Sequence, residues 1–186
     1  MSSSKWNIDA TWTLFLDRDG VINKRIFGGY ITSPEAFEFE EGVLNALKGL
    51  TPKFNRIVVV TNQQGIGKGL MSERNLFDIH TYMNNQIHKV GGKVDKCFFA
   101  PNLRGADEDL RKPKPAMAEM AKLEFPEIEF ERSVMVGDTD SDIEFGKNLG
   151  MKTVRIQTEE PIGLEADLTV SSLNEFYTWL NDELED

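Results

Sequence analysis

The sequence is poor in the features that stabilise secreted proteins, cross membranes or bind nucleic acid. A single cysteine among 186 residues excludes an intrachain disulfide, which fits a reducing compartment. No apolar run approaches the roughly 18 residues of a membrane-spanning helix, and the first residues hold no apolar segment of signal-peptide length. The net charge of -10 opposes nonspecific binding to nucleic acid or anionic membranes. We therefore expect a cytoplasmic monomer that binds neither nucleic acid nor a membrane.

What is present is the composition of a globular domain. Apolar residues make up 40% and charged residues 28% of the chain, and the length fits one domain spanning residues 1–186. Strands are predicted at residues 14–16, 57–60, 94–99, 134–136, 153–156 and 168–170, and helices at 43–50, 72–90, 115–125, 143–149 and from 172 onward. This alternation predicts an α/β fold with a doubly wound, Rossmann-like parallel sheet and helices on both faces.

Capping signals mark the ends of two of these helices. Ser72 is a candidate N-cap for the longest helix, which a Gly-Gly pair at 91–92 should stop. Ser172 and Glu175 form the pattern of a capping box at the start of the last helix. The side chains of that helix expected to face the core are Leu173, Phe176, Leu180 and Leu184.

Two acids follow the first predicted strand. Asp17 ends the apolar run, Asp19 comes two residues later, and Gly20 lets the backbone turn so that both carboxylates face one pocket. Close carboxylates suit a bound cation, or a pair in which one acid is protonated and the other ionised. The first acid could be a nucleophile and the second a general acid and base. An ordinary strand-to-turn exit uses the same residue types.

The second predicted strand ends at Thr61 and Asn62 and runs into a glycine-rich segment. A hydroxyl and backbone amides at a strand end suit a phosphate oxygen, and the glycines allow the backbone to approach it. A nucleotide-binding loop fits poorly, because Lys68 precedes Gly69 rather than Ser or Thr and the glycine spacing misses the dinucleotide fingerprint. A flexible loop without a ligand is the other interpretation.

Two later segments carry charge near predicted helix starts. Arg111 and Lys112 precede two prolines and could hold a phosphoryl group, whereas Lys114 is better explained as solvated. Asp138 and Asp142 could cap a helix or supply the hard oxygen ligands that Mg²⁺ prefers, and the intervening Asp140 is expected to be solvated or capping. In a doubly wound sheet ligands bind beyond the carboxyl ends of the strands, so these segments should meet.

Taken in chain order, these segments resemble the motifs of the haloacid dehalogenase superfamily of phosphohydrolases over roughly residues 12–172. The motifs are Asp17-Arg-Asp-Gly-Val after a strand, Thr61-Asn after a strand, Arg111-Lys-Pro before a helix, and Gly137-Asp after a strand. Within the superfamily, Asp-Arg-Asp-Gly, Gly-Tyr-Ile, Thr-Asn-Gln-Gln-Gly and Arg-Lys-Pro-Lys-Pro together resemble the family of histidinol phosphatases and D-glycero-D-manno-heptose-1,7-bisphosphate 7-phosphatases. That family lacks a large cap domain, and here residues 23–41 indicate only an irregular flap.

The resemblance implies hydrolysis of a small phosphomonoester through an aspartyl phosphate. Asp17 would attack phosphorus, and Asp19 would protonate the leaving alkoxide and then take a proton from water. Thr61 and Lys112 would hold the phosphoryl oxygens. Mg²⁺ would be bound by Asp17, Asp138, the backbone carbonyl of Asp19 and, as a ligand or a supporting group, Asp142. The residues assigned to substrate contact are Arg25, Gly28, Asn62, Gln63, Arg111 and Thr139.

The sequence departs from the family at the loop before Arg111. Many members carry a Cys/His zinc loop there, but residues 100–110 of this chain hold neither Cys nor His, so no zinc is expected. Cys97 is predicted to be a small core residue, and His80 and His88 to be surface or packing residues.

The sequence is compatible with several functions. The Gly-Tyr-Ile flap and the segment Thr61–Gly69 favour the heptose-bisphosphate branch, with histidinol phosphate as the alternative substrate. A polynucleotide 3′-phosphatase shares the chemistry, but the acidic net charge argues against it. A phospho-acceptor signalling module also groups acids, a Thr and a Lys around Mg²⁺, but its acceptor needs no acid two residues later, so Asp19 discriminates the two classes.

Overall fold

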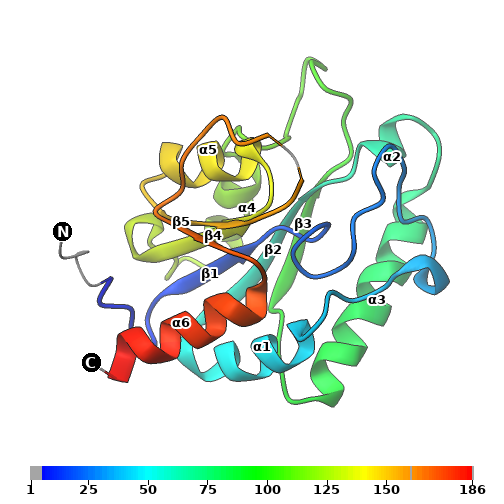
Figure 1. Ribbon diagram of the computed structural model, residues 1–186. Helices are drawn as coiled ribbons and strands as arrows, with labels where there is room; N and C mark the ends of the chain where they lie inside the picture. Colours follow the sequence, from blue (N-terminus) through cyan, green and yellow to red (C-terminus); the bar gives the residue numbers. More distant parts are fainter. Residues whose placement is uncertain (1–5, 160, 186) are drawn as a thin grey trace.

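Six parallel strands form one sheet in the order β3-β2-β1-β4-β5-β6 in a computed structural model that describes residues 6–159 and 161–185 (Figure 1). The ends of the predicted domain, 1–186, lie outside the described residues. The strands are β1 (Thr13–Leu16), β2 (Arg56–Asn62), β3 (Lys96–Ala100), β4 (Ser133–Gly137), β5 (Lys152–Ile156) and β6 (Leu168–Val170). The predicted parallel sheet is confirmed.

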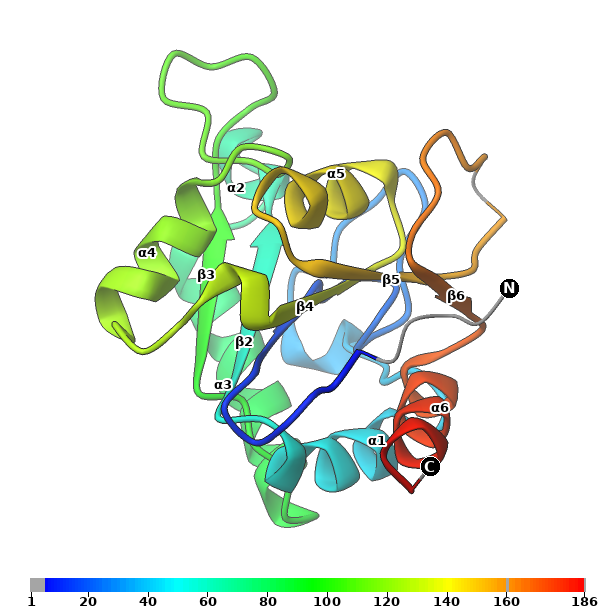
Figure 2. The ribbon, with the colours of Figure 1, turned by 90° about the vertical axis from the view of Figure 1, so that its left-hand side faces the viewer.

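Helices cover both faces of this sheet. One face carries α1 (Val43–Leu50), α3 (Glu73–Lys89) and α6 (Leu173–Glu185), and the other carries α4 (Ala116–Glu124) and α5 (Asp140–Asn148) (Figures 1 and 2). A short helix, α2 (Gln64–Gly67), follows β2. Within the described residues, no helix is long and apolar enough to cross a membrane. The doubly wound architecture is therefore the one that the alternating pattern predicted.

The central strand shows why the strand sequences are apolar without alternation. Leu14 and Leu16 pack into the core beneath α1, α3 and α6, while Phe15 packs into the core beneath α4 and α5. All three side chains are fully buried. Because both faces of the sheet are covered, every position of a central strand is buried, and continuous apolar runs result.

The strand order places the functional segments at one edge. Leu16 of β1 is paired with Val59 of β2 on one side and with Val136 of β4 on the other, so the order reverses at β1. The segments after these strands leave from the same carboxyl edge, where α/β sheets bind ligands. Within residues 17–42, the connection after β1 forms turns and a 3-10 turn (Pro34–Ala36) rather than a separate cap.

Two details of the last helix differ from the prediction. The backbone amide of Glu175 donates to Ser172 Oγ, as a capping box requires, but its carboxylate accepts from the amide and hydroxyl of Ser171, one residue earlier. Leu184 was predicted to face the core and is instead 43% exposed. Helical periodicity identifies the face a residue lies on, but not where the neighbouring elements end.

The starts of one strand and one helix also differ from the prediction, each because of local hydrogen bonds. Strand β3 begins at Lys96 rather than at residue 94, because the Asp95 carboxylate accepts from the backbone amide of Ile57 and closes the turn before the strand. Helix α5 begins at Asp140 rather than at residue 143, because the Thr139 hydroxyl and the Asp142 carboxylate cap its first turn reciprocally. The acids expected at a helix start therefore form the first turn of the helix.

Candidate active site

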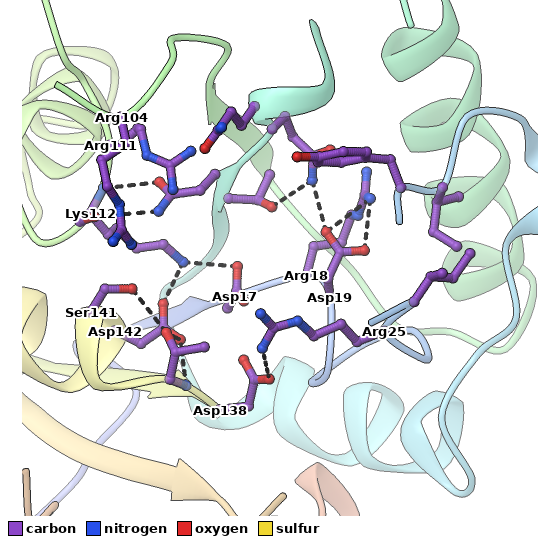
Figure 3. A pocket seen from close by; sticks show the side chains of 18 of the residues that line it. Asp17, Arg18, Asp19, Arg25, Arg104, Arg111, Lys112, Asp138, Ser141 and Asp142 are labelled. Carbon is purple, nitrogen blue, oxygen red and sulfur yellow. Dashed lines mark hydrogen bonds and ion pairs between the residues drawn. The ribbon is translucent and has the colours of Figure 1, made fainter. Parts of the chain in front are cut away.

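A cavity of about 580 Å³ lies at the carboxyl edge of the sheet and gathers side chains from well-separated parts of the sequence (Figure 3). Every site residue predicted from the sequence lines it. These residues are Asp17, Asp19, Arg25, Gly28, Thr61, Asn62, Gln63, Arg111, Lys112, Asp138, Thr139 and Asp142.

Three buried acids form a cluster at the floor of this cavity. Asp17, Asp138 and Asp142 each offer a carboxylate oxygen, and these oxygens all lie within 4.8 Å of one another. Burial raises the pKa of Asp17 to about 6, since Lys112 only partly offsets the lost hydration. Burial and the neighbouring carboxylates raise the pKa of Asp138 to about 8. Such a cluster favours a bound divalent cation, for which carboxylate oxygens are the preferred ligands.

Two further observations fit a cation at this cluster. Asp138 Oδ1 is buried and has no hydrogen-bond partner among the described residues, which is costly for a carboxylate oxygen. Gly20 adopts a φ of +88°, and a Cβ there would lie 2.4 Å from Asp138 Oδ2. Glycine thus lets the loop after β1 approach the Asp138 carboxylate closely.

Lys112 is buried between two of the acids. Its Nζ lies 2.8 Å from Asp17 Oδ1 and 2.6 Å from Asp142 Oδ1, and it donates to the Val60 carbonyl at 2.7 Å. Burial alone would lower the pKa of Lys112, but the two carboxylates raise it above its usual value. The ammonium group is therefore a fixed positive charge beside Asp17.

Asp142 uses both of its carboxylate oxygens within the protein. Oδ1 pairs with Lys112, while Oδ2 accepts from the Thr139 amide at 3.0 Å and from the Thr139 hydroxyl at 2.8 Å. The hydroxyl of Thr139, a predicted substrate contact, is also 2.9 Å from Ser141 Oγ. This geometry suits Asp142 to orienting Lys112 and starting α5 better than to binding a cation directly.

Asp19 lies in a different electrostatic environment. Arg18 Nη2 donates to both of its oxygens at 2.8 and 3.0 Å, Asn23 Nδ2 donates at 3.0 Å and Gln63 Nε2 at 2.9 Å. Burial alone would raise the pKa of Asp19, but the Arg18 charge and these hydrogen bonds hold it below its usual value. Gln63 also donates to Thr61 Oγ1 at 2.9 Å. Its amide thus links two site residues, and its predicted contact with substrate stays a prediction.

Two other predicted substrate contacts also have partners within the protein. Arg25 Nη1 donates to Asp138 Oδ2 at 3.1 Å, and its guanidinium lies 5.5 Å from the centre of the Phe27 ring. Asn62 Oδ1 accepts from the Lys112 amide at 2.9 Å, and Asn62 Nδ2 donates to the Lys112 carbonyl at 3.3 Å. Asn62 therefore fixes the backbone that carries Lys112.

Comparison with known proteins identifies the family of this chain. A family model described as HAD-hydrolase-like matches residues 109–169. A D-glycero-alpha-D-manno-heptose-1,7-bisphosphate 7-phosphatase from Mycobacterium bovis is 40% identical over 138 residues, which are 74% of this chain and 73% of the relative. The chain belongs to the heptose-bisphosphate phosphatase family of haloacid dehalogenase-like hydrolases.

Other members of the heptose-bisphosphate phosphatase family match more of the chain. A D-glycero-beta-D-manno-heptose-1,7-bisphosphate 7-phosphatase from Helicobacter pylori is 32% identical over 169 residues, covering 90% of this chain and 95% of the relative. The crystal structure of the B. bronchiseptica D,D-heptose 1,7-bisphosphate phosphatase, complexed with magnesium and phosphate, superimposes with a TM-score of 0.82 at 26% identity. That match covers 92% of this chain and 99% of the other.

This family member has a group of basic residues of which the motifs revealed only Arg111 as a site residue. Lys68 and Arg104 line the cavity together with Arg111, and we call these three residues the cationic wall. Arg104 lies beside Arg111 in Figure 3, and Arg111 Nη1 is buried with no hydrogen-bond partner in the part of the chain that the structure describes. Among the described residues, no carboxylate forms an ion pair or hydrogen bond with these three side chains. Arg104 comes from the loop that lacks the zinc ligands, where no motif points to it.

His80 packs behind Asp19, on the far side of Arg18. Its Nε2 lies 3.4 Å from Arg18 Nη1, and the imidazole is only 8% exposed. Burial and the Arg18 charge lower the pKa of His80 to about 3, so the ring is neutral in the folded protein. His80 is thus a packing residue, one of the two roles predicted, and His88 is exposed.

The buried His80 should contribute a loss of stability in mild acid. Below pH 6.5 the imidazole of His80 binds a proton in the unfolded chain, but it stays neutral in the folded protein, where its pKa is about 3. The free energy of unfolding should therefore fall by about 1.4 kcal/mol per pH unit on this account, or about 2 kcal/mol between pH 6.5 and 5. The raised pKa values of Asp17 and Asp138 act in the opposite direction over this range, so urea denaturation at several pH values measures the contribution of His80 as the difference between the wild type and a His80 variant.

Two variants separate this contribution from those of other groups. The pH dependence of the free energy of unfolding should differ between His80→Gln and the wild type by this amount, whereas His88→Gln, at an exposed position on the same helix, should match the wild type. Equal slopes in both variants would show that His80 is not the group responsible.

Proposed function

We propose that this protein is a Mg²⁺-dependent phosphatase that hydrolyses the 7-phosphate of D-glycero-D-manno-heptose 1,7-bisphosphate. The observation that carries the proposal is one cavity with two kinds of polar group. A cluster of Asp17 and Asp138 with Lys112 suits the reacting phosphate, and the cationic wall suits a second anion. Relatives of 32–40% identity are named for this activity.

Asp17 is the proposed nucleophile. Its carboxylate oxygen attacks phosphorus as the bond to the ester oxygen breaks, which leaves an aspartyl phosphate and an alkoxide. Lys112 Nζ, 2.8 Å from Asp17 Oδ1, is placed to neutralise a phosphoryl oxygen at the attacked phosphate. Thr61 Oγ1 accepts from Gln63, which leaves its hydroxyl hydrogen to be donated to the phosphate. Asp17, Asp138 and the backbone carbonyl of Asp19 would hold Mg²⁺, which supplies positive charge to the phosphate when bound.

Asp19 is the proposed general acid and base. It must enter the first step protonated and gives that proton to the leaving alkoxide. In the second step a water attacks phosphorus, the bond to Asp17 breaks, and Asp19 takes the water proton. Its hydrogen bonds favour the ionised form, which is the form the second step needs. A phosphate dianion entering the cavity favours protonation of Asp19 and so prepares the first step.

The cationic wall favours a bisphosphate over the alternative substrate. A second phosphate would pair with Arg104 and Arg111, whose charges otherwise face each other in the cavity. Histidinol phosphate carries an ammonium group instead, which these charges would repel. Relatives named for the alpha and for the beta anomer both match this chain, so the proposal covers either anomer.

Phosphate release with Mg²⁺ tests this assignment directly. Both anomers of the heptose bisphosphate, histidinol phosphate and an aryl phosphate are compared, with Asp17→Asn as the blank. We expect kcat/KM for one heptose bisphosphate to exceed that for histidinol phosphate by about a hundredfold, equivalent to about 2.7 kcal/mol of differential transition-state binding. Faster turnover of histidinol phosphate would favour the alternative, and turnover of the aryl phosphate alone would leave the chemistry but reject both substrates.

A variant of the cationic wall links the preference to its proposed cause. Arg104→Ala should lower kcat/KM for the bisphosphate by about tenfold to a hundredfold, the range of a charged hydrogen bond, and leave the aryl phosphate unaffected. Arg74→Ala, which removes an exposed arginine of α3 paired with Asp78, is the matched control and should change neither.

A further inference from the structure

Arg155 is a buried arginine beside the site to which the proposed chemistry assigns no role. It lies in β5, paired in register with Gly137, the residue before Asp138. The residue is only 2% exposed, although an isolated buried guanidinium is expensive. The residues it contacts indicate what it does.

The Arg155 guanidinium connects three parts of the chain. Nη1 donates to the backbone carbonyl of Asp138 at 3.2 Å. Nη2 lies 2.5 Å from Asp140 Oδ1 and also donates to the carbonyl of Leu164 at 2.9 Å. Asp140 was predicted to be solvated or capping, and it forms the first turn of α5, but it also binds this arginine. The strand, the peptide of Asp138 and the segment after β5 are thereby held together.

Asp140 extends the same network into the segment at residues 161–164. Its Oδ2 accepts from the Gly163 amide at 3.0 Å, and its Oδ1 accepts from the Leu164 amide at 3.2 Å. A Cβ at residue 163 would lie 2.6 Å from Asp140 Oδ2, so a side chain there would have to displace the Asp140 carboxylate from this contact. Pro161 in this segment lines the cavity. The Arg155–Asp140 pair therefore fixes part of the cavity wall.

A purely stabilising role explains this arrangement poorly, since buried ion pairs often contribute little net stability. The segment has a second attachment, because Asp167 Oδ2 accepts from the Thr153 amide and hydroxyl, both at 2.8 Å. Compared with the attachment through Thr153 and Asp167, Arg155 adds a hydrogen bond to the backbone carbonyl of Asp138. The carboxylate of Asp138 belongs to the acid cluster. The carbonyl and the carboxylate belong to one residue, so a contact that fixes the carbonyl restrains the backbone that carries the carboxylate.

We propose that Arg155 is a positioning residue that holds Asp138 in place for the cation and the segment 161–164 in place as a wall of the cavity. The inference rests on the proposed function, in which Asp138 binds Mg²⁺. Arg155 acts through Asp138 and Asp140 and does not touch the reacting groups itself.

Calorimetric titration of the full chain with Mg²⁺ alone, without substrate, tests this role. Arg155→Met keeps most of the side-chain volume but removes all donors, and we expect the Kd for Mg²⁺ to rise by about tenfold, as changes next to metal ligands typically do. Thr153→Val loosens the other attachment of the same segment and should leave the Kd within about twofold of the wild type. Thermal unfolding of each variant reports stability separately.

The outcomes distinguish the two proposals. An unchanged Kd in a folded Arg155→Met protein would overturn the positioning role and leave the phosphatase assignment intact. A wild-type chain that binds no Mg²⁺ and releases no phosphate would overturn the proposed function itself. If Arg155→Met does not fold, Asp140→Asn decides: a Kd raised at least threefold supports the role, and an unchanged Kd rejects it.

Discussion

Asp17→Asn should lower kcat by at least about 10⁴-fold, the scale seen when the nucleophile of a hydrolase is removed. The amide of asparagine cannot attack phosphorus, so no aspartyl phosphate forms. The fold should persist, because Asp17 is a buried acid among acids and its removal relieves the repulsion from Asp138 and Asp142. Lys112 keeps Asp142 as a partner at 2.6 Å. Without Mg²⁺, the free energy of unfolding should therefore be equal to or higher than that of the wild type.

Single-turnover kinetics with acid quench and mass spectrometry measures this effect. The wild type should yield a trapped phosphorylated chain, and Asp17→Asn should yield none. Asp78→Asn replaces a half-exposed acid of α3, paired with Arg74, and serves as the matched control with unchanged kcat. Residual activity of Asp17→Asn above a hundredth of the wild-type value, or a phosphorylated chain in this variant, would exclude Asp17 as the nucleophile.

Asp19→Asn should lower kcat for an alkyl phosphate by about 10²- to 10⁴-fold, the usual contribution of a general acid and base. Asparagine retains the size and part of the hydrogen bonding that joins Asp19 to Arg18 and Gln63, so the site geometry should be kept. An aryl phosphate should lose less in the first step, because a phenolate leaves without protonation. The second step still lacks its base, so the aspartyl phosphate should accumulate.

Initial rates on esters of graded leaving-group pKa, with detection of the phosphorylated chain, check this prediction. Asn23→Ala removes one donor to Asp19 without removing the carboxylate and is the control, with a much smaller loss. The same measurement separates an enzyme from a phospho-acceptor signalling module, since a mere acceptor would be indifferent to Asp19. Equal rates of phosphorylation and of alkyl ester hydrolysis in the wild type and Asp19→Asn would reject the catalytic role.

The position of the site was predictable because each residue proposed to take part in the reaction directly follows an apolar strand or precedes a helix. Asp17, Thr61 and Asp138 follow β1, the body of β2 and β4, and parallel strands deliver their carboxyl ends to one edge. The fold class followed from the alternation of apolar runs with periodic segments. These signals are local in the sequence, and the parallel topology of the sheet brings the residues that carry them close together.

The partners of the side chains were not predictable, because they depend on residues far away in the sequence. Gln63 donates to Asp19, from which it is separated by 44 positions in the sequence. Asn62 accepts from the backbone of Lys112, 50 positions away. Both amides are predicted from their place in a motif to contact substrate, and that role stays a prediction beside the contacts that the fold gives them. Arg104 and Arg155 belong to no motif, so only the fold reveals that they lie at the cavity or beside it.

The central place of β1 has a consequence for how the chain becomes active during synthesis. β1 is made first, yet it ends up between β2 and β4, and Lys112 lies 95 positions beyond Asp17. Until β4 docks, the backbone groups along one edge of β1 are unpaired and can pair with strands of other chains. Such non-local pairing is slow, because long loops must close before their contacts form. Return of turnover after denaturation therefore requires that β4 and the segment of Lys112 have joined β1.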